Sequence, residues 1–373
     1  MYGKSLPTPM EMFQGNSDPM FDQASQELER TGRVMQVQIP CTSLLRINQG
    51  LSRLLAKSIR HRTRTGHCGI LPNMVTDIQP LVRRSLLVVS VLDEEALLDA
   101  VHCLADAIVL DITCRAPKPL RDDARRRIPI VLEALSNSRS ELLLWTDADS
   151  IAADLAVCAP YSFGGVLVTV DDSSEIRAID IALTSWEQTH GMFDDTLNVE
   201  LVIANARAVN NAGELAKVSR RSVAIAVDEA MLLREQGLTT SDNSGRLLYH
   251  KGKVAIAASS AGLQVHALGN SGRTIKERAI AGRQAGLRGS LCFNSTEVAP
   301  INIGFRPSYQ ELQKAQRVSN TMQDAINKGS GAVRISSGQM ADLANIRGAQ
   351  VLIAWNDAVK NREAVVSTKT IFR

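Results

Sequence analysis

Residues 85–112, SLLVVSVLDEEALLDAVHCLADAIVLDI, contain two apolar, β-branched runs separated by a stretch of helical character. The runs at Ser85–Val91 and Ala107–Ile112 are apolar nearly throughout, which is typical of parallel strands buried on both faces. Between them, Asp93–Leu104 is a plausible helix. The stretch therefore predicts a strand, a crossover helix and a second parallel strand.

The same alternation continues along the chain. Six further strand-like runs are Leu142–Trp145, Gly165–Val170, Val199–Ile203, Val223–Val227, Val265–Leu268 and Leu291–Phe293. Consecutive runs begin roughly 20 to 40 residues apart, which leaves room for a helix and is too far for a hairpin. Plausible helices are Asp93–Leu104, Arg121–Leu135, Ser173–Gln188, Arg246–Ala261 and Thr274–Ala285. Eight repeats favour an α/β fold of the (β/α)8 TIM barrel type, whereas the alternative, a doubly wound open sheet, usually stops near about six strands.

The segments that flank the barrel differ in composition. We expect residues 1–80 to form an N-terminal extension, 81–305 the barrel, and 306–373 a C-terminal helical lid or oligomerisation segment, with helices at Ser308–Ile326 and Ala341–Ala358. No acidic residue lies between Glu29 and Asp77, whereas Arg and Lys recur there, so residues 42–64 could form a basic amphipathic helix. A helix that covers one end of the barrel or a subunit interface is favoured over an anionic surface, a nucleic acid or organellar targeting as its role.

Composition excludes several classes of protein. The chain has 373 residues, a net charge of +3 and 45% hydrophobic residues, so disorder is excluded and bulk charge does not indicate nucleic acid or a membrane as partner. Its six cysteines are widely spaced without metal-type pairs, which favours a reducing compartment. Since the sequence also lacks the apolar run of a signal peptide or membrane span, we expect a soluble, cytoplasmic protein.

Carboxylates follow several of the predicted strands. In a TIM barrel the reaction centre lies at the carboxyl ends of the strands, where this sequence places Asp147, Asp171, Asp228 and Glu229. Converging carboxylates hold Mg2+, and Asp228 and Glu229 are the best placed as metal ligands. The alternative is that each Asp caps the helix that follows it. His266, within the seventh strand, is interpreted as a hydrogen-bonded histidine of the barrel wall rather than an acid or base.

A series of motifs resembles the citrate lyase beta-subunit branch of the HpcH/HpaI aldolase family over about residues 82–358. RRSLLVVSV and ADAIVLDI resemble the first two strands of the family, and Arg121 and Arg125 in RDDAR occupy its Lys-x-x-x-Arg helix start. LLYHKGKVAIAASSAGLQ resembles a crossover helix, AGLRGSLCFNSTEVAPINIGFRPS the eighth strand and its exit, and SSGQMAD the lid turn. Each motif is moderately specific, and their common order strengthens the match.

The resemblance implies a trimeric or hexameric barrel with a helical lid that cleaves or forms carbon–carbon bonds in acyl-CoA or keto-acid substrates with Mg2+. In that chemistry the metal and an Arg stabilise an enolate oxygen. It also implies that Arg84, Arg121 and Arg125 could meet the phosphates of a CoA-type ligand, with surface ion pairing to Asp122 and Asp123 as the alternative. Asp342 retains the acid of the lid.

This sequence departs from the family where the chemistry is expected. The Arg that ends strand three aligns with Trp145, the Lys after strand four with Thr169, and the metal-binding Glu after strand five with Ala204. The Glu-Asp pair of strand two is Thr113-Cys114, and the His-Pro after strand eight is Asn294-Ser295. Two hypotheses follow.

The first is a degenerate, non-catalytic or altered structural or regulatory subunit of a homo-oligomer, or of a hetero-oligomer with an active paralogue or other subunit. Such a subunit could still bind a small acidic or CoA-linked ligand. The second is an active Mg2+-dependent carbon–carbon lyase with a rebuilt site, in which Glu229 and Asp228 hold the metal. Asp147 or Asp171 would then replace the missing carboxylate, and Asp342 would be the lid acid.

Overall fold

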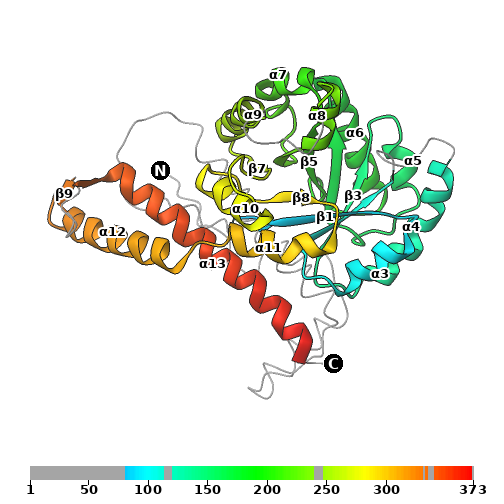
Figure 1. Ribbon diagram of the computed structural model, residues 1–373. Helices are drawn as coiled ribbons and strands as arrows, with labels where there is room; N and C mark the ends of the chain where they lie inside the picture. Colours follow the sequence, from blue (N-terminus) through cyan, green and yellow to red (C-terminus); the bar gives the residue numbers. More distant parts are fainter. Residues whose placement is uncertain (1–79, 113–119, 239–246, 331, 335–339, 372–373) are drawn as a thin grey trace, which may run out of the picture. The chain divides into compact units, whose positions relative to one another are not determined.

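The computed structural model describes residues 80–112, 120–238, 247–330, 332–334 and 340–371, and its central element is a parallel eight-stranded sheet (Figure 1). The strands are β1 (Ser85–Ser90), β2 (Ala107–Asp111), β3 (Glu141–Thr146), β4 (Gly165–Thr169), β5 (Asn198–Ile203), β6 (Ser222–Val227), β7 (Gln264–His266) and β8 (Ser290–Cys292). They hydrogen-bond in the order β7-β6-β5-β4-β3-β2-β1-β8, and an isolated bridge between His266 and Gly289 links the two outer strands. The sheet thus nearly closes on itself, which confirms the predicted (β/α)8 barrel.

Helices follow the strands and cover the outside of the sheet. They are α3 (Glu94–His102), α4 (Arg121–Leu135), α5 (Ile151–Leu155), α6 (Ser173–Thr189), α7 (Ala206–Leu215), α8 (Glu229–Glu235), α9 (Leu248–Ala261), α10 (Ile275–Gln284) and α11 (Ser295–Phe305). Side chains cap two of these helices: Asp93 accepts a hydrogen bond from the Ala96 amide at the start of α3, and Asp172 forms a capping box with Glu175 at the start of α6. The basic segment predicted as a helix at 42–64 and the rest of the N-terminal extension up to residue 79 lie outside the described residues.

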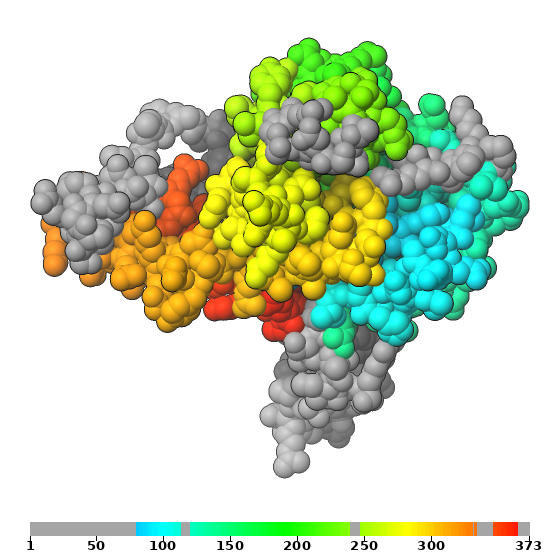
Figure 2. Space-filling view, viewed as in Figure 1, coloured from blue at the N-terminus to red at the C-terminus, as the bar shows by residue number. Residues whose placement is uncertain are grey.

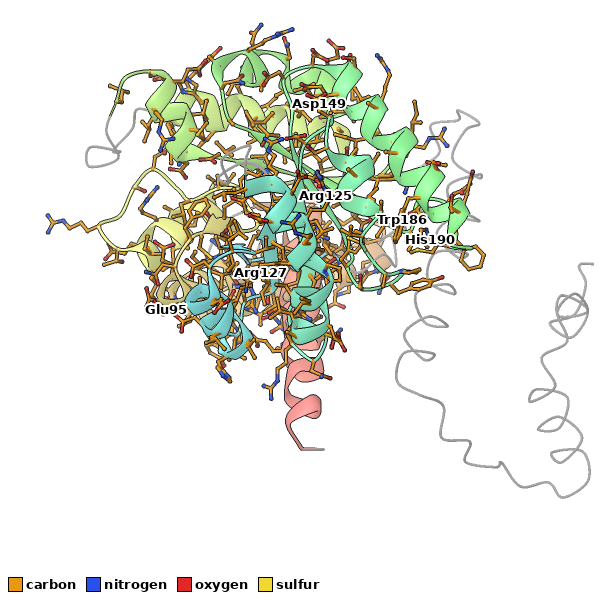
Figure 3. The ribbon with its side chains drawn as sticks, turned by 90° about the vertical axis from the view of Figure 1, so that its right-hand side faces the viewer. Glu95, Arg125, Arg127, Asp149, Trp186 and His190 are labelled. Carbon is orange, nitrogen blue, oxygen red and sulfur yellow. The ribbon has the colours of Figure 1, made fainter. Side chains whose placement is uncertain are left out.

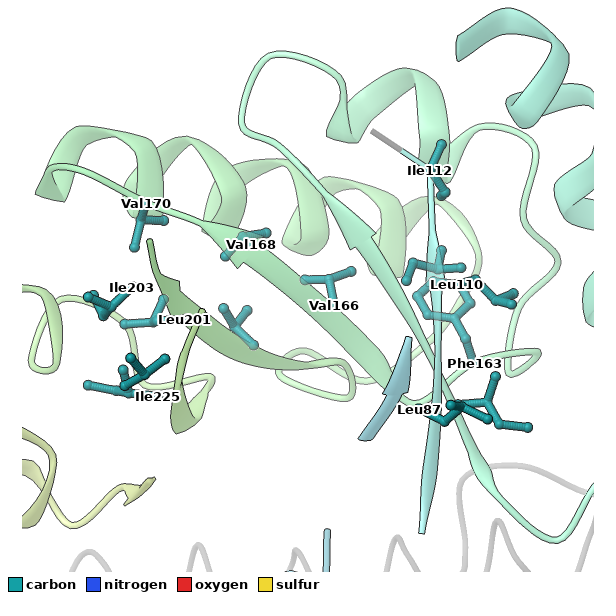
Figure 4. Packing of buried hydrophobic residues seen from close by; sticks show 14 of the residues in the cluster. Leu87, Leu110, Ile112, Phe163, Val166, Val168, Val170, Leu201, Ile203 and Ile225 are labelled. Atoms are coloured by element: carbon teal, nitrogen blue, oxygen red, sulfur yellow. The ribbon is translucent and has the colours of Figure 1, made fainter. Parts of the chain in front are cut away.

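Two apolar layers make the core. The larger fills the space between the strands and the helices, where residues such as Leu110, Val168 and Ile203 are buried (Figure 4). The smaller lies inside the barrel, because alternate residues of each strand point inward. Its members are Leu86, Val88, Ala107, Val109, Leu143, Trp145, Leu167, Val202, Ala226 and Leu291. Burial on both faces is the reason that the strands read as continuous apolar runs.

A network of buried ionic side chains lies inside the barrel, near the amino-terminal ends of the strands. Arg83 donates to both oxygens of Glu141 at 2.8 and 2.7 Å and to Glu200 at 3.2 Å. Glu200 in turn lies 2.6 Å from Nδ1 of His266, and both side chains are fully buried. Buried charges persist only when they are paired, so this network holds β1, β3, β5 and β7 in register. His266 is thereby a hydrogen-bonded barrel histidine, as the sequence predicted.

The C-terminal residues form a helical hairpin that continues from the barrel. It comprises α12 (Tyr309–Asn327), the antiparallel pair β9 (Ala332–Arg334) and β10 (Met340–Asp342), and α13 (Leu343–Ile371), with Val318, Met322 and Ile346 in its small core. Helix α13 extends beyond the predicted end at Ala358 because no Gly or Pro follows Ala358 within it and its later turns contact the barrel. Arg362 donates to the carbonyls of Asp106 and Arg139 at 2.7 and 2.8 Å. Across the described residues, no helix combines the length and the apolar character that a membrane crossing requires.

Candidate functional site

The carboxyl ends of the strands form the mouth of the barrel. Asp147 follows β3, Asp171 lies beyond β4, and Asp228 follows β6 and precedes α8. The structure therefore places these three predicted residues, together with Glu229, at the expected end of the fold. What decides their chemistry is the partner that each carboxylate already has.

Asp147 is used in two local contacts. Its Oδ2 lies 3.0 Å from an Arg121 guanidinium nitrogen, and its Oδ1 accepts from the Ser150 amide at 2.9 Å, one residue before α5 begins. Arg121 also donates to the Ser150 hydroxyl at 3.2 Å. The structure thus brings together a predicted catalytic residue and a predicted phosphate-binding residue, and it joins them as an ion pair that fixes the start of α5 against α4.

Arg125 stands one turn further along α4 (Figure 3). Its Nε donates to Asp154 at 2.9 Å and its Nη1 to Asp122 at 2.9 Å. Asp154 is buried and also accepts from the Thr146 hydroxyl at 2.6 Å. The contact with Asp122 is the ion pair that the sequence offered as the alternative to phosphate binding, whereas Asp154 was not anticipated.

Asp171 connects two neighbouring loops of the mouth. Its Oδ1 accepts from the Asn205 side-chain amide at 2.5 Å, and its backbone amide donates to Glu175 at 2.6 Å. Asn205 itself caps α7, since its oxygen accepts from the Ala208 amide at 2.8 Å. The cap of α6 is Asp172, so Asp171 serves to align the β4 and β5 loops.

The β6 acids lie in a cluster that the sequence did not reveal. Glu229 is clasped by Lys251 Nζ at 2.8 Å and by an Arg278 guanidinium nitrogen at 3.0 Å. Lys251 also donates to the Leu268 carbonyl at 2.8 Å, just past β7. Asp228 is buried and caps α8 by accepting from the Met231 amide at 3.0 Å, which is the alternative role considered for each of these acids.

Burial lowers the pKa of Lys251, and the nearby Arg278 lowers it further, against the opposing effect of Glu229. Glu229 thus lies between two cationic side chains at this part of the mouth. Lys251 stands in the LLYHKGKV motif and Arg278 in the following helix α10, so the two could be recognised as site residues only once the fold brought them together.

No group of three or more His, Cys, Asp or Glu side chains in the described segments could hold a metal ion. Mg2+ prefers an octahedral set of oxygen ligands, and Glu229 already has two cationic neighbours. The donor set that the structure describes therefore does not fit a divalent ion, and the metal role of Asp228 and Glu229 stays a prediction.

Aromatic and small side chains occupy the inner wall of the mouth. Trp145 is 1% exposed, and its indole N–H donates to the Thr169 hydroxyl at 3.1 Å. These are the two positions where the resemblance placed an Arg and a Lys, and Ala204, at the position of the metal-binding Glu, is buried beyond β5. Asp111 pairs in register with Trp145 and is buried, so it is an interior carboxylate that sequence reasoning passed over.

Arg84 is not part of this arrangement. Arg84 immediately precedes β1, at the end of the barrel opposite to Arg121 and Arg125. Its guanidinium binds both oxygens of Asp106 at 2.8 and 3.1 Å and Glu363 of α13 at 2.9 Å. The structure therefore separates Arg84 from the other two predicted phosphate ligands and uses it to anchor α13. The backbone of Asp342 ends β10, and its side chain lies outside the described atoms.

The family model for HpcH/HpaI aldolase/citrate lyase matches residues 84–295, which span β1 to the start of α11. The chain belongs to the HpcH/HpaI aldolase/citrate lyase family. Citrate lyase subunit beta of Leuconostoc mesenteroides subsp. cremoris is 24% identical over 255 residues, which cover 66% of this chain and 84% of that protein. The subunit of Escherichia coli K12 is 23% identical over 288 residues, or 73% and 92% of the two chains.

Solved structures of this family show the same fold. A citrate lyase from Burkholderia xenovorans LB400 superposes with a TM-score of 0.62 at 13% identity, over 76% of this chain and 94% of the other. The protein CitE of Mycobacterium tuberculosis, crystallised with magnesium, acetoacetate and coenzyme A, gives a TM-score of 0.55 at 17% identity, over 74% and 98% of the chains. At such identities the likeness extends to the barrel and leaves the chemistry of the mouth to this chain's own residues.

Proposed function

We propose that this family member is a citrate lyase beta-subunit-like protein whose carbon–carbon lyase site no longer catalyses, and that it acts as a structural or regulatory subunit of an oligomer. The observation that supports this most directly is the hydrogen bond between Trp145 and Thr169. A retro-aldol or Claisen-type reaction needs positive charge beside the enolate oxygen as it forms. At these two positions the wall offers a neutral donor that is already paired and buried.

The energetic consequence is large. Removing one group that stabilises a developing oxyanion costs about 3–4 kcal/mol, or roughly two to three orders of magnitude in rate. Replacement of the Arg, the Lys and a metal carboxylate together would suppress the family reaction by many orders of magnitude. The partners found for Asp147, Asp171 and Asp228 favour the same conclusion, because each of these carboxylates already accepts a hydrogen bond from an amide, of Ser150, Asn205 and Met231 respectively.

The proposal is tested by two measurements on the full chain. Titration with Mg2+ and Mn2+ by calorimetry is expected to show no saturable binding, and a panel of malyl-, citramalyl- and citryl-type thioesters is expected to remain uncleaved with either ion present. Tight metal binding that disappears in Glu229→Ala, or turnover above the level of a heat-inactivated sample, would overturn it. The exposed acid Glu95 supplies a matched control, since Glu95→Ala should leave both measurements unchanged.

A second candidate function rests on the cations at Glu229. Lys251 and Arg278 provide positive charge at the mouth without a metal, so an active lyase with a rebuilt site would use them to stabilise the enolate. In that case cleavage of a thioester or keto acid would survive EDTA and would be lost in Lys251→Met. If neither the wild type nor Lys251→Met cleaves any of these substrates, this second function is ruled out and the non-catalytic role is retained.

The ligand and the compartment are part of the proposal. A small acidic or CoA-linked ligand would meet Arg121 and Arg125, which are partly exposed beside the mouth, whereas Arg84 is excluded by its place at the opposite end. The expected partners are other copies of the chain or an active paralogue. Free thiols at Cys103, Cys158 and Cys292 support a reducing, cytoplasmic setting.

A further inference from the structure

Helix α12 carries a regular stripe of uncharged polar side chains on its outer face. Its members are Tyr309, Gln313, Gln316, Asn320, Gln323 and Asn327, and all six are exposed. Their spacing alternates between four and three residues, as at the a and d positions of a coiled coil. We call these six residues the amide seam.

The amide seam lies opposite the face by which α12 packs on its own chain. The buried residues of the helix are Ala315, Val318, Met322 and Ala325, which follow the same helical period half a turn away. Arg283 and Glu311 pair at 2.9 Å near the first turn and attach α12 to the barrel on that inner side. Within the described residues no side chain covers the seam, since all six of its members are exposed, and α12 is drawn in orange in Figure 2.

The chemistry of the seam suits a copy of itself. Each Asn or Gln side chain has a carbonyl that accepts and an NH2 group that donates, so a row of amides is complementary to an identical row. Burying paired amides costs less than burying charges, and the seam is free of charged residues over its whole length. Exposed helix faces usually carry about one charged residue in three or four, which makes an uncharged row of six distinctive.

Two charged residues beside the seam determine whether two copies of α12 would pair parallel or antiparallel. Arg317 and Asp324 lie along the same edge of the helix. They are seven residues apart, about two turns, and this separation is too large for them to contact each other. A two-fold axis that passes near Asn320 and runs perpendicular to the helix keeps this edge on the same side in both copies. In that antiparallel arrangement Arg317 of one copy meets Asp324 of the other, twice per contact. A parallel arrangement would place the two edges on opposite sides of the pair.

Neither residue has an ionic partner within its own chain, as far as the described segments go. Arg317 makes only a long contact to the Gln313 carbonyl at 3.4 Å, and Asp324 accepts the backbone amide of Lys328 through its own carbonyl, which leaves its carboxylate exposed. Three features favour a second copy of α12 as the occupant of this face. They are the opposite charges on one edge, the uncharged and self-complementary seam, and the exposure of the seam.

We propose that α12 forms an antiparallel two-fold contact with α12 of a second copy through the amide seam, flanked by two Arg317–Asp324 ion pairs. This inference deepens the oligomer part of the proposed function. It is independent of the non-catalytic part, because its tests measure mass and cross-linking rather than turnover.

The first test is a charge exchange measured by sedimentation of the full chain at low ionic strength. Arg317→Asp and Asp324→Arg each replace two attractions by two repulsions, and each is expected to weaken self-association at least about tenfold and to leave most of the contacts dissociated at a concentration near the wild-type dissociation constant. The double variant Arg317→Asp/Asp324→Arg restores both pairs and is expected to recover the wild-type mass. Lys314→Asp, a charge reversal on the same helix away from the seam, should leave the mass unchanged.

The second test is cross-linking. Asn320→Cys places a thiol near the two-fold axis, so mild oxidation is expected to yield a covalent dimer, whereas Lys314→Cys and the wild type should yield none. Circular dichroism of each variant would establish that it is folded. The inference is overturned if Arg317→Asp has the mass of the wild type at low salt, if the double variant stays as dissociated as the single ones, or if Asn320→Cys forms no more covalent dimer than Lys314→Cys.

Discussion

Arg83→Met is expected to lower the free energy of unfolding by about 3–5 kcal/mol, because it removes one partner from a buried ionic network. The guanidinium is 1% exposed and makes two hydrogen bonds to Glu141 and one to Glu200, a carboxylate with no exposed surface. Methionine fills much of the same volume, so packing is largely retained. The expected loss therefore reflects chiefly the uncompensated charge of Glu200, with only His266 left beside it.

The magnitude follows from what each contact contributes. Hydrogen bonds to charged groups contribute about 1.5–3 kcal/mol each, but part of that sum returns as the guanidinium no longer has to be desolvated. In a domain of this size about 3–5 kcal/mol corresponds to a fall in Tm of roughly 6 °C or more. The effect should also exceed that at any exposed ion pair of the same residue types.

Chemical unfolding followed by circular dichroism measures the change, with Arg126→Met as the control. Arg126 pairs with Asp123 on the surface of α4, with exposed fractions of 73% and 51%, so its loss should cost less than about 0.5 kcal/mol. A loss of under about 1 kcal/mol in Arg83→Met, or equal losses in the two variants, would refute the view that this network holds the base of the barrel together.

Three further outcomes are expected. Burial alone would raise the pKa of Glu311, but hydrogen bonds from Arg283 and Ser308 lower the pKa from 4.5 to about 2. The ionised Glu311 side chain therefore contributes its full stabilisation above pH 4.5, and this contribution is lost as the pH falls toward 2. Glu311→Gln should flatten the pH dependence of unfolding in that window, and a constant offset from the wild type would contradict this. Gly289→Ala would bring a Cβ into steric conflict with the backbone carbonyl oxygen of Arg83 and should cost about 1–3 kcal/mol by thermal unfolding. Gly213→Ala, with open space around it in α7, should be neutral or slightly stabilising. Burial and Asp154 raise the pKa of Cys158 to about 12, so its alkylation at pH 8 should proceed only as fast as the protein unfolds, and rapid labelling of the native chain would count against that burial.

Local pattern was sufficient for most of the fold. The eight apolar runs and the five predicted helices lie where the sequence predicts, because strands buried on both faces are largely apolar and helices have their own apolar period. The (β/α)8 topology then follows from the spacing, since parallel strands require a crossover between them. Position relative to each strand also placed Asp147, Asp171, Asp228 and Glu229 at the mouth.

The local sequence pattern did not predict which side chains pair with the charged residues of the barrel. Lys251 lies 22 residues beyond Glu229 and Arg278 a further 27, and no local rule relates a lysine in one helix to an arginine in the next. Arg84 was grouped with Arg121 and Arg125 on resemblance, although it begins a strand and the other two begin a helix, so they lie at opposite ends of the barrel.

The sequence by itself determined the succession of strands and helices, the family and the neutral residues Trp145, Thr169 and Ala204 at positions where the resemblance implies charged ones, because these depend on residue type and order along the chain. Only the tertiary structure decided which charges meet: Glu229 with Lys251 and Arg278, Glu200 with Arg83 and His266, and Arg84 with α13. The reason is that ion pairs form between side chains from elements far apart in sequence, and closing the barrel is what brings those elements within hydrogen-bonding distance.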